Sequence, residues 1–114
     1  MIIDESHQDM FSPNFWGIEC NHGWYNIINS TLNQIKYYCE QKNIELPKIT
    51  QIKEKFGTLR IYISYGDDVI FNLIDLAERM SEVTCDICGK PGKLYSDQGW
   101  LTTLCEEHQE QSNN

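Results

Sequence analysis

The chain has 114 residues, of which 40% are hydrophobic and 23% charged, as is usual for a small globular protein. Its 17 acidic and 9 basic residues give a formal charge of −8, which disfavours nonspecific nucleic-acid binding by the surface as a whole. The odd count of five cysteines argues against a secreted disulfide scaffold and for a reducing environment. No signal peptide or membrane-spanning run is recognisable, so the sequence predicts a soluble cytoplasmic protein with no membrane contact.

The N-terminal segment has no regular hydrophobic period. Residues 1–15 are polar and acidic, so we expect an ordered arm at best. The aromatic residues Phe11, Phe15 and Trp16 are the ones expected to pin this arm to the rest of the protein.

An amphipathic helix is predicted across residues 23–42. Apolar residues recur there at steps of three and four, from Trp24 to Cys39. Asn21 is the expected N-cap, and Asn43 is expected to close the helix.

A β-hairpin is predicted over residues 48–65. Apolar and polar residues alternate from Leu59 onward, which indicates a half-buried strand, and residues 49–54 are expected to pair with it. Ile49 and Ile52 do not share the same parity, so the faces of the hairpin stay open at this stage.

A second amphipathic helix is predicted over residues 68–82. Its apolar residues follow at steps of three, one, three and three, at Ile70, Leu73, Ile74, Ala77 and Met80. Asp67 is the expected N-cap, and Asp67 and Asp68 together complement the helix dipole.

The strongest chemical signal is a pair of short ligand motifs near the C-terminus. Cys85 and Cys88 form the first pair, Cys105 and His108 the second, each with two residues between its members, and 16 residues lie between the pairs. Three cysteines and one histidine at this spacing predict a tetrahedral zinc site. Four protein ligands close the coordination sphere, so we expect one structural Zn²⁺.

The overall prediction is an α+β fold in which two helices and a β-hairpin are followed by a zinc-ribbon-like lobe. We place the first module at residues 1–82 and the lobe at residues 83–114. In the lobe we expect a hairpin around residues 97–99 and a short helix over residues 104–111. The expected apolar core of the lobe consists of Ile87, Leu94, Tyr95, Trp100 and Leu101.

The hairpin carries a small basic and aromatic cluster. Candidate partner-binding residues there are Lys53, Lys55, Arg60 and Tyr62. Such a surface suits an anion, a nucleic-acid backbone or an acidic partner. The alternative is a solvated strand face whose cations pair with acids of the helices.

A cysteine nucleophile is the best catalytic alternative. Cys20 lies near a predicted helix N-terminus, which lowers a thiol pKa, and His22 is close enough in sequence to act as its base. The competing interpretation is a partly buried, inert thiol, and no third, orienting group can be named. We therefore expect no catalytic residue.

Several motifs together resemble those of a known family. In chain order they are Glu19-Cys20, Gly23-Trp24-Tyr25, Gln51-Ile52-Lys53-Glu54-Lys55-Phe56-Gly57-Thr58-Leu59-Arg60, Ala77-Glu78, Ser81, Cys85-x-x-Cys88-Gly89, Gly92, Trp100, Thr103-Leu104-Cys105 and His108. Over residues 17–108 the chain resembles a family of small, largely uncharacterised proteins of bacteriophages, prophages and bacteria. The resemblance implies no named activity, but it implies a setting inside a bacterial host cell, where small acidic phage proteins often bind host machinery.

Three functional hypotheses follow from these observations. The first is a non-enzymatic, zinc-stabilised protein that binds a host protein or complex, with inhibition of a bacterial defence system as one such role. The second is a nucleic-acid-binding accessory protein that uses the basic hairpin, although the net charge disfavours it. The third is a small enzyme centred on Cys20.

Overall fold

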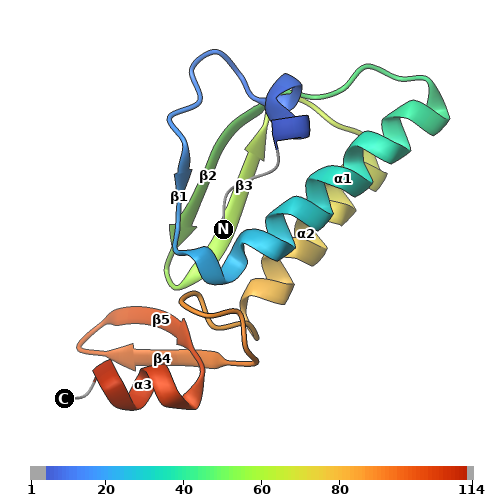
Figure 1. Ribbon diagram of the computed structural model, residues 1–114. Coiled ribbons are helices and arrows are strands. Elements are labelled where there is room, and N and C mark those ends of the chain that lie inside the picture. Colours follow the sequence, from blue (N-terminus) through green and yellow to red (C-terminus); the bar gives the residue numbers. More distant parts are fainter. Residues whose placement is uncertain (1–4, 113–114) are drawn as a thin grey trace.

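Figure 1 shows the computed structural model of the protein, which describes residues 5–112, so the first four residues of the predicted arm lie outside the described part. The described chain has the predicted α+β fold, with three α-helices, a three-stranded sheet and a two-stranded sheet. In chain order these elements are β1 (Ile18–Glu19), α1 (Tyr25–Lys42), β2 (Ile49–Lys55), β3 (Thr58–Ile63), α2 (Asp68–Ser81), β4 (Lys93–Asp97), β5 (Trp100–Leu104) and α3 (Glu106–Ser112). Short 3₁₀ helices span Glu5–Met10 and His22–Trp24.

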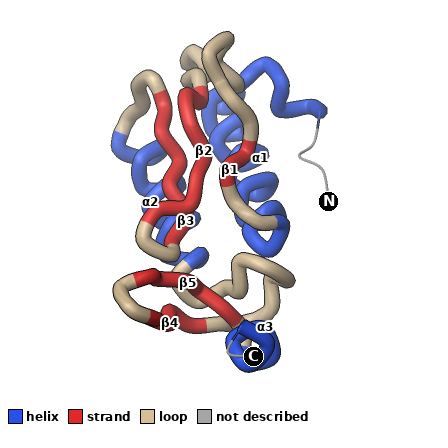
Figure 2. Tube along the Cα trace, turned by 90° about the vertical axis from the view of Figure 1, so that its left-hand side faces the viewer, coloured by secondary structure: helices blue, strands red, loops and turns tan. Residues whose placement is uncertain are grey.

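The larger sheet and the two long helices form a two-layer body. The strand order is β1-β2-β3, with β1 parallel and β3 antiparallel to the central β2. Both α1 and α2 cover the same face of this sheet (Figure 1, Figure 2). The core between the layers includes Ile28, Leu32, Ile35, Ile52, Leu59, Ile61, Ile70, Ile74 and Ala77. The helical and strand periods of the sequence therefore mark the faces that are buried.

A β-bulge in β2 resolves the parity conflict of the hairpin. Ile49 lies opposite Ile63, whereas Gln51 lies opposite Tyr62, so the register shifts between Ile49 and Gln51. The irregularity brings Ile49 to the face that Ile52 occupies, and both side chains are fully buried.

Helix α2 covers the open edge of β3. The backbone N–H of Leu59 donates to Ser81 Oγ at 2.9 Å, and the N–H of Ile61 donates to Glu78 Oε2 at 3.1 Å. These side chains satisfy donors that a bare edge strand would leave unpaired, so α2 both fills the core and protects the sheet edge.

The segment before β1 is packed more firmly than an arm. His7 and Met10 are fully buried. The rings of Phe11 and Phe15 stack with centroids 4.4 Å apart and pack against the core, as expected. Trp16 is 92% exposed, so its predicted role as an anchor is wrong.

The helix ends follow the sequence signals with one exception. Asn43 closes α1 in the left-handed conformation, with φ of 54°, and Asp67 Oδ1 accepts from the N–H of Ile70 at 3.0 Å. The prediction that Asn21 caps the first helix is wrong, because the 3₁₀ turn His22–Trp24 separates it from α1 and it makes no side-chain cap hydrogen bond.

The hairpin β4–β5 and helix α3 form the zinc-ribbon-like lobe at one end of a molecule that measures 51 × 24 × 23 Å (Figure 1). The predicted apolar core of this lobe is wrong in most of its members. The buried cluster consists of Cys85, Leu104 and Cys105, with Tyr95 packed against it, whereas Ile87, Leu94 and Trp100 are exposed. A two-stranded sheet without a second apolar layer cannot bury all of its large side chains. The division of the chain at residue 82 stays a prediction.

Asp67 provides a test of how α2 is held. Its carboxylate caps α2 and accepts a hydrogen bond from the Tyr38 hydroxyl of α1, and the Tyr38 contact followed by the Ile70 N–H lowers the Asp67 pKa. We expect Asp67→Ala to lower the melting temperature by about 5 °C at pH 7. Because the folded pKa is lowered, this difference from wild type exists above the ordinary pKa of 3.8 and shrinks as the pH falls below it.

The matched control is Asp68→Ala, which removes a neighbouring acid from the first turn of the same helix. Thermal melts of both variants between pH 7 and pH 3 check the prediction. Equal effects of the two substitutions would contradict the role given to Asp67.

Candidate metal centre

The first ligand pair lies on a tight loop that follows α2. The N–H of Cys85 donates to Lys90 O at 2.8 Å, and the N–H of Gly89 donates back to Cys85 O at 3.0 Å. Gly89 has φ of 84°, a left-handed conformation that glycine adopts without strain. This loop holds the sulfurs of Cys85 and Cys88 toward one point.

The second pair lies where β5 passes into α3. Cys105 directly follows the strand, and its carbonyl accepts from the N–H of Gln109 at 3.0 Å, which closes the first helical turn. His108 lies three residues after Cys105, a spacing that places both side chains on one side of that turn. The backbone N of His108 lies 3.5 Å from Cys105 Sγ.

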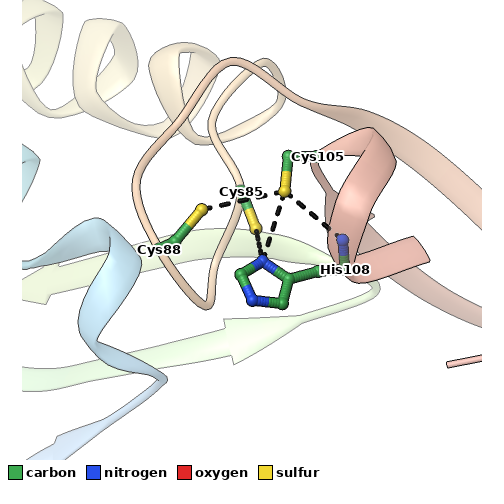
Figure 3. A group of neighbouring side chains, drawn as sticks. All are labelled: Cys85, Cys88, Cys105 and His108. Carbon is green, nitrogen blue, oxygen red and sulfur yellow. Dashed lines mark hydrogen bonds between the residues drawn. The ribbon is translucent and has the colours of Figure 1, made fainter. Parts of the chain in front are cut away.

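The four side chains converge on one point (Figure 3). Their ligand atoms all lie within 4.8 Å of one another. Cys88 Sγ lies 3.7 Å from Cys105 Sγ, and His108 Nδ1 lies 3.2 Å from Cys105 Sγ and 3.5 Å from Cys85 Sγ. In a tetrahedron with zinc–ligand distances of about 2.3 Å for sulfur and about 2.0 Å for nitrogen, sulfurs lie about 3.8 Å apart and sulfur and nitrogen about 3.5 Å. The donor set therefore fits one zinc ion.

The electrostatics of the cluster also favour a bound cation. Burial opposes ionisation of Cys85, but the backbone N–H groups of Cys105, Cys88 and Ile87 lower the pKa of its thiol to about 6. At Cys88 the N–H of Lys90 lowers the pKa, yet partial desolvation and the neighbouring Cys85 sulfur outweigh it and raise that pKa. A divalent cation removes this conflict, because it stabilises the neighbouring thiolates together.

The arrangement is that of a structural site. Four protein ligands fill a tetrahedral sphere, and catalytic zinc instead keeps one position open for water or substrate. Cys85 and Cys105 are buried, and Cys88 lies at the surface. The geometry is consistent with the single structural Zn²⁺ predicted from the sequence.

The zinc-binding lobe meets the body at a seam formed by residues 21–24, 57, 84–86 and 101–103. The N–H of Gly23 donates to Asp86 O at 2.8 Å, and the indole N–H of Trp24 donates to Thr84 O at 2.9 Å. Thr103 Oγ1 donates to Gly57 O at 2.7 Å. A Cβ atom on Gly23 would lie 2.1 Å from the Cys85 carbonyl oxygen, so only glycine allows this approach.

The candidate partner-binding residues of the hairpin are partly engaged within the protein. Lys53 lies opposite Arg60 in the sheet, and its Nζ is 5.9 Å from the ring centre of Tyr62. Arg60 Nη1 lies 3.7 Å from Glu78 Oε1, so its charge is paired with an acid of α2. Lys55 is exposed near the turn. A role of these four residues in partner binding stays a prediction.

The environment of Cys20 argues against a nucleophile. Burial, followed by the negative charges of Asp86 and Glu54, raises the pKa of the Cys20 thiol to about 12. The thiol is therefore protonated at neutral pH, whereas nucleophilic cysteines need a lowered pKa. The His22 ring packs edge-on against Tyr25, with ring centroids 4.9 Å apart.

Two residues of the seam, Asp86 and Asn21, are not among the sites predicted from the sequence. Asp86 lies between the ligands Cys85 and Cys88, yet it is only 6% exposed, and its Oδ1 has no hydrogen-bond partner. The side-chain amide of Asn21 donates to it, with Nδ2 3.4 Å from Asp86 Oδ2. These residues are 65 positions apart, and no local pattern in the sequence indicates that they meet.

Comparison with known proteins adds no relative: no protein-family model, curated protein or solved structure matches the chain. The resemblance to small phage and bacterial proteins therefore stays a prediction from the motifs. Within residues 5–112 no helix has both the length and the apolar character needed to cross a membrane.

Removal of one ligand tests the metal centre. We expect Cys88→Ser to lose stoichiometric zinc after dialysis against a chelator, because structural zinc in small peptides contributes roughly 10–16 kcal/mol of apparent binding energy. The melting temperature should fall by about 10 °C or more. Metal analysis by mass spectrometry and a thermal melt measure both effects.

Cys20→Ser is the matched control, because it replaces a half-buried cysteine outside the ligand set. It should retain one zinc per chain. Stoichiometric zinc together with an unchanged melting curve in Cys88→Ser would rule out the assignment.

Proposed function

We propose that the protein is a non-enzymatic, zinc-stabilised binding protein that engages a host protein or complex in the bacterial cytoplasm. The zinc site serves the fold, and binding takes place on the surface that it holds in position. The resemblance to phage and prophage proteins suggests the setting, and inhibition of a bacterial defence system is the role proposed within it.

The observation that carries this proposal is the exposure of two large aromatic side chains beside the seam. Trp100 is 75% exposed at the start of β5, and Phe56 is 67% exposed in the β2–β3 turn. The two lie on touching segments, because a Cβ atom on Gly57 would be 3.0 Å from the Leu101 backbone. Tryptophan and other aromatic residues are enriched where protein interfaces concentrate their binding energy.

Phe56 is exposed at a cost to the fold. Phe56 and Gly57 have φ of 54° and 83°, the conformation of a two-residue hairpin turn that favours Asn-Gly. A bulky residue is uncommon in this left-handed region, where side chains other than glycine and asparagine are disfavoured by roughly 1–2 kcal/mol. Burial does not compensate, so a contact with a partner is a physical reason for a phenylalanine at this turn.

The charge distribution favours a protein partner with basic groups over nucleic acid. The chain carries a formal charge of −8, which repels phosphate backbones and attracts basic surfaces. On the hairpin, the ion pair of Arg60 with Glu78 removes one of the few cations that a nucleic-acid backbone could use.

A single substitution separates stability from binding. We expect Phe56→Asn to raise the free energy of unfolding by about 1 kcal/mol, because asparagine tolerates the left-handed conformation. The same change should weaken capture of the partner at least about tenfold, because it removes an exposed aromatic contact. Denaturant melts and quantitative affinity capture from nuclease-treated bacterial lysate measure the two effects.

Gln98→Asn is the matched control, since Gln98 occupies the equivalent left-handed position, with φ of 52°, in the β4–β5 turn. It should stabilise the protein without changing capture. Capture that requires intact nucleic acid, or that is equal for wild type and Phe56→Asn, would count against the proposal.

A further inference from the structure

We propose that the acidic cleft beside the seam binds the guanidinium group of an arginine on an exposed segment of the partner protein. The inference rests on the proposed function and names the chemistry that the partner presents. The cleft is made of two adjoining hollows, and Asp86 lines both of them.

The two hollows share part of their lining and differ in the rest. The first has a volume of about 390 Å³ and reaches Glu19 and Glu54, and the second has a volume of about 400 Å³ and reaches Asp97 and Tyr95. Asn21, Asp86, Trp100 and Thr102 line both hollows. Two adjoining hollows of this volume suit a peptide segment rather than a single small ion.

The carboxylate of Asp86 is poised to accept a hydrogen bond from a ligand. Its side chain is buried, Oδ2 accepts weakly from Asn21 at 3.4 Å, and Oδ1 has no partner. A buried acceptor without a donor is unfavourable, and it regains its hydrogen bond when a ligand supplies a donor.

The charge of the lining selects a cation. Glu19, Glu54, Asp86 and Asp97 bring four carboxylates to the two hollows, and no lysine, arginine or histidine lines either of them. One oxygen of Glu54 accepts from the N–H of Gly57 at 2.7 Å, which fixes the position of its carboxylate at the cleft.

A guanidinium fits this lining better than a metal ion or an ammonium group. Among the described residues, the only group of potential ligands that converges closely enough for one ion is the zinc cluster. The carboxylates of the cleft are dispersed, which matches the five divergent donors of a planar guanidinium. The exposed indole of Trp100 offers a face on which that plane can stack.

A peptide titration of the zinc-loaded full chain tests this inference. The probes are acetylated, amidated Ser-Gly-Arg-Gly-Ser, the same peptide with citrulline or lysine in place of arginine, and free L-arginine. Citrulline keeps the shape of arginine but lacks the charge. The Trp100 indole N–H and the Asn21 side-chain amide report binding by NMR.

We expect the arginine peptide to shift both reporter signals and to bind at least about tenfold more tightly than the citrulline peptide. The lysine peptide should bind more weakly than the arginine peptide, because an ammonium group lacks the planar fork. Free L-arginine should also bind more weakly, because it leaves the second hollow empty.

Three variants locate the site. Glu54→Gln and Asp86→Asn should each weaken binding of the arginine peptide at least about fivefold. Trp100→Ala should do the same, and it keeps the test decisive if Asp86→Asn disturbs the adjacent ligand loop, because the Trp100 side chain is mostly exposed. Glu40→Gln removes the same charge from the exposed surface of α1 and should have no effect.

Equal affinity for the citrulline and arginine peptides would overturn the inference, and so would equal weakening by Glu40→Gln and Glu54→Gln. If free L-arginine binds as tightly as the peptide, the ligand of the cleft is a small molecule and not a polypeptide segment. That result would also overturn the inference. These outcomes leave the Phe56 capture experiment unaffected. Conversely, arginine-specific binding at the cleft without Phe56-dependent capture would contradict the proposed function alone.

Discussion

The close backbone contact between Gly23 and the first ligand loop is the constraint on which the arrangement of the protein depends. The Gly23 N–H donates to Asp86 O at 2.8 Å, and a side chain at residue 23 would collide with the Cys85 carbonyl. Next to it, the buried Trp24 belongs to the core and also donates to Thr84 O. The short turn at residues 23–24 thus joins the first ligand loop to the hydrophobic core. The loop restricts the position of the core, and the core restricts the position of the loop.

In the function proposed above, zinc acts through this contact. The ion does no chemistry in a closed coordination sphere, but it keeps Cys85 and Cys88 on a tight loop whose middle carries Asp86. Asp86 lines the cleft, and its backbone carbonyl accepts from the N–H of Gly23. The exposed aromatic residues, Phe56 and Trp100, flank the same seam. A metal that serves only the fold would in this way determine the shape of the proposed binding surface.

Local patterns made most of the fold predictable. The periods of α1, α2 and β3 mark faces that are buried, and Asn43 and Asp67 end and begin helices where their side chains and backbone conformations suit those positions. The zinc ligands were recognisable because the two members of each ligand pair are only three positions apart in the sequence. Strand β1 was missed because two residues show no period, and the roles of Asn21 and Asp86 were missed because they depend on a contact across 65 positions.

We infer that the metal holds the first ligand loop against Gly23. Amide hydrogen exchange of the full chain with and without a zinc chelator tests it most directly. Chelation should speed exchange of the Gly23 amide and the Trp24 indole at least about tenfold, while the Ile61 amide, which donates to Glu78 in the body, stays protected. Unchanged protection of Gly23 and Trp24 in the chelated protein would contradict the claim.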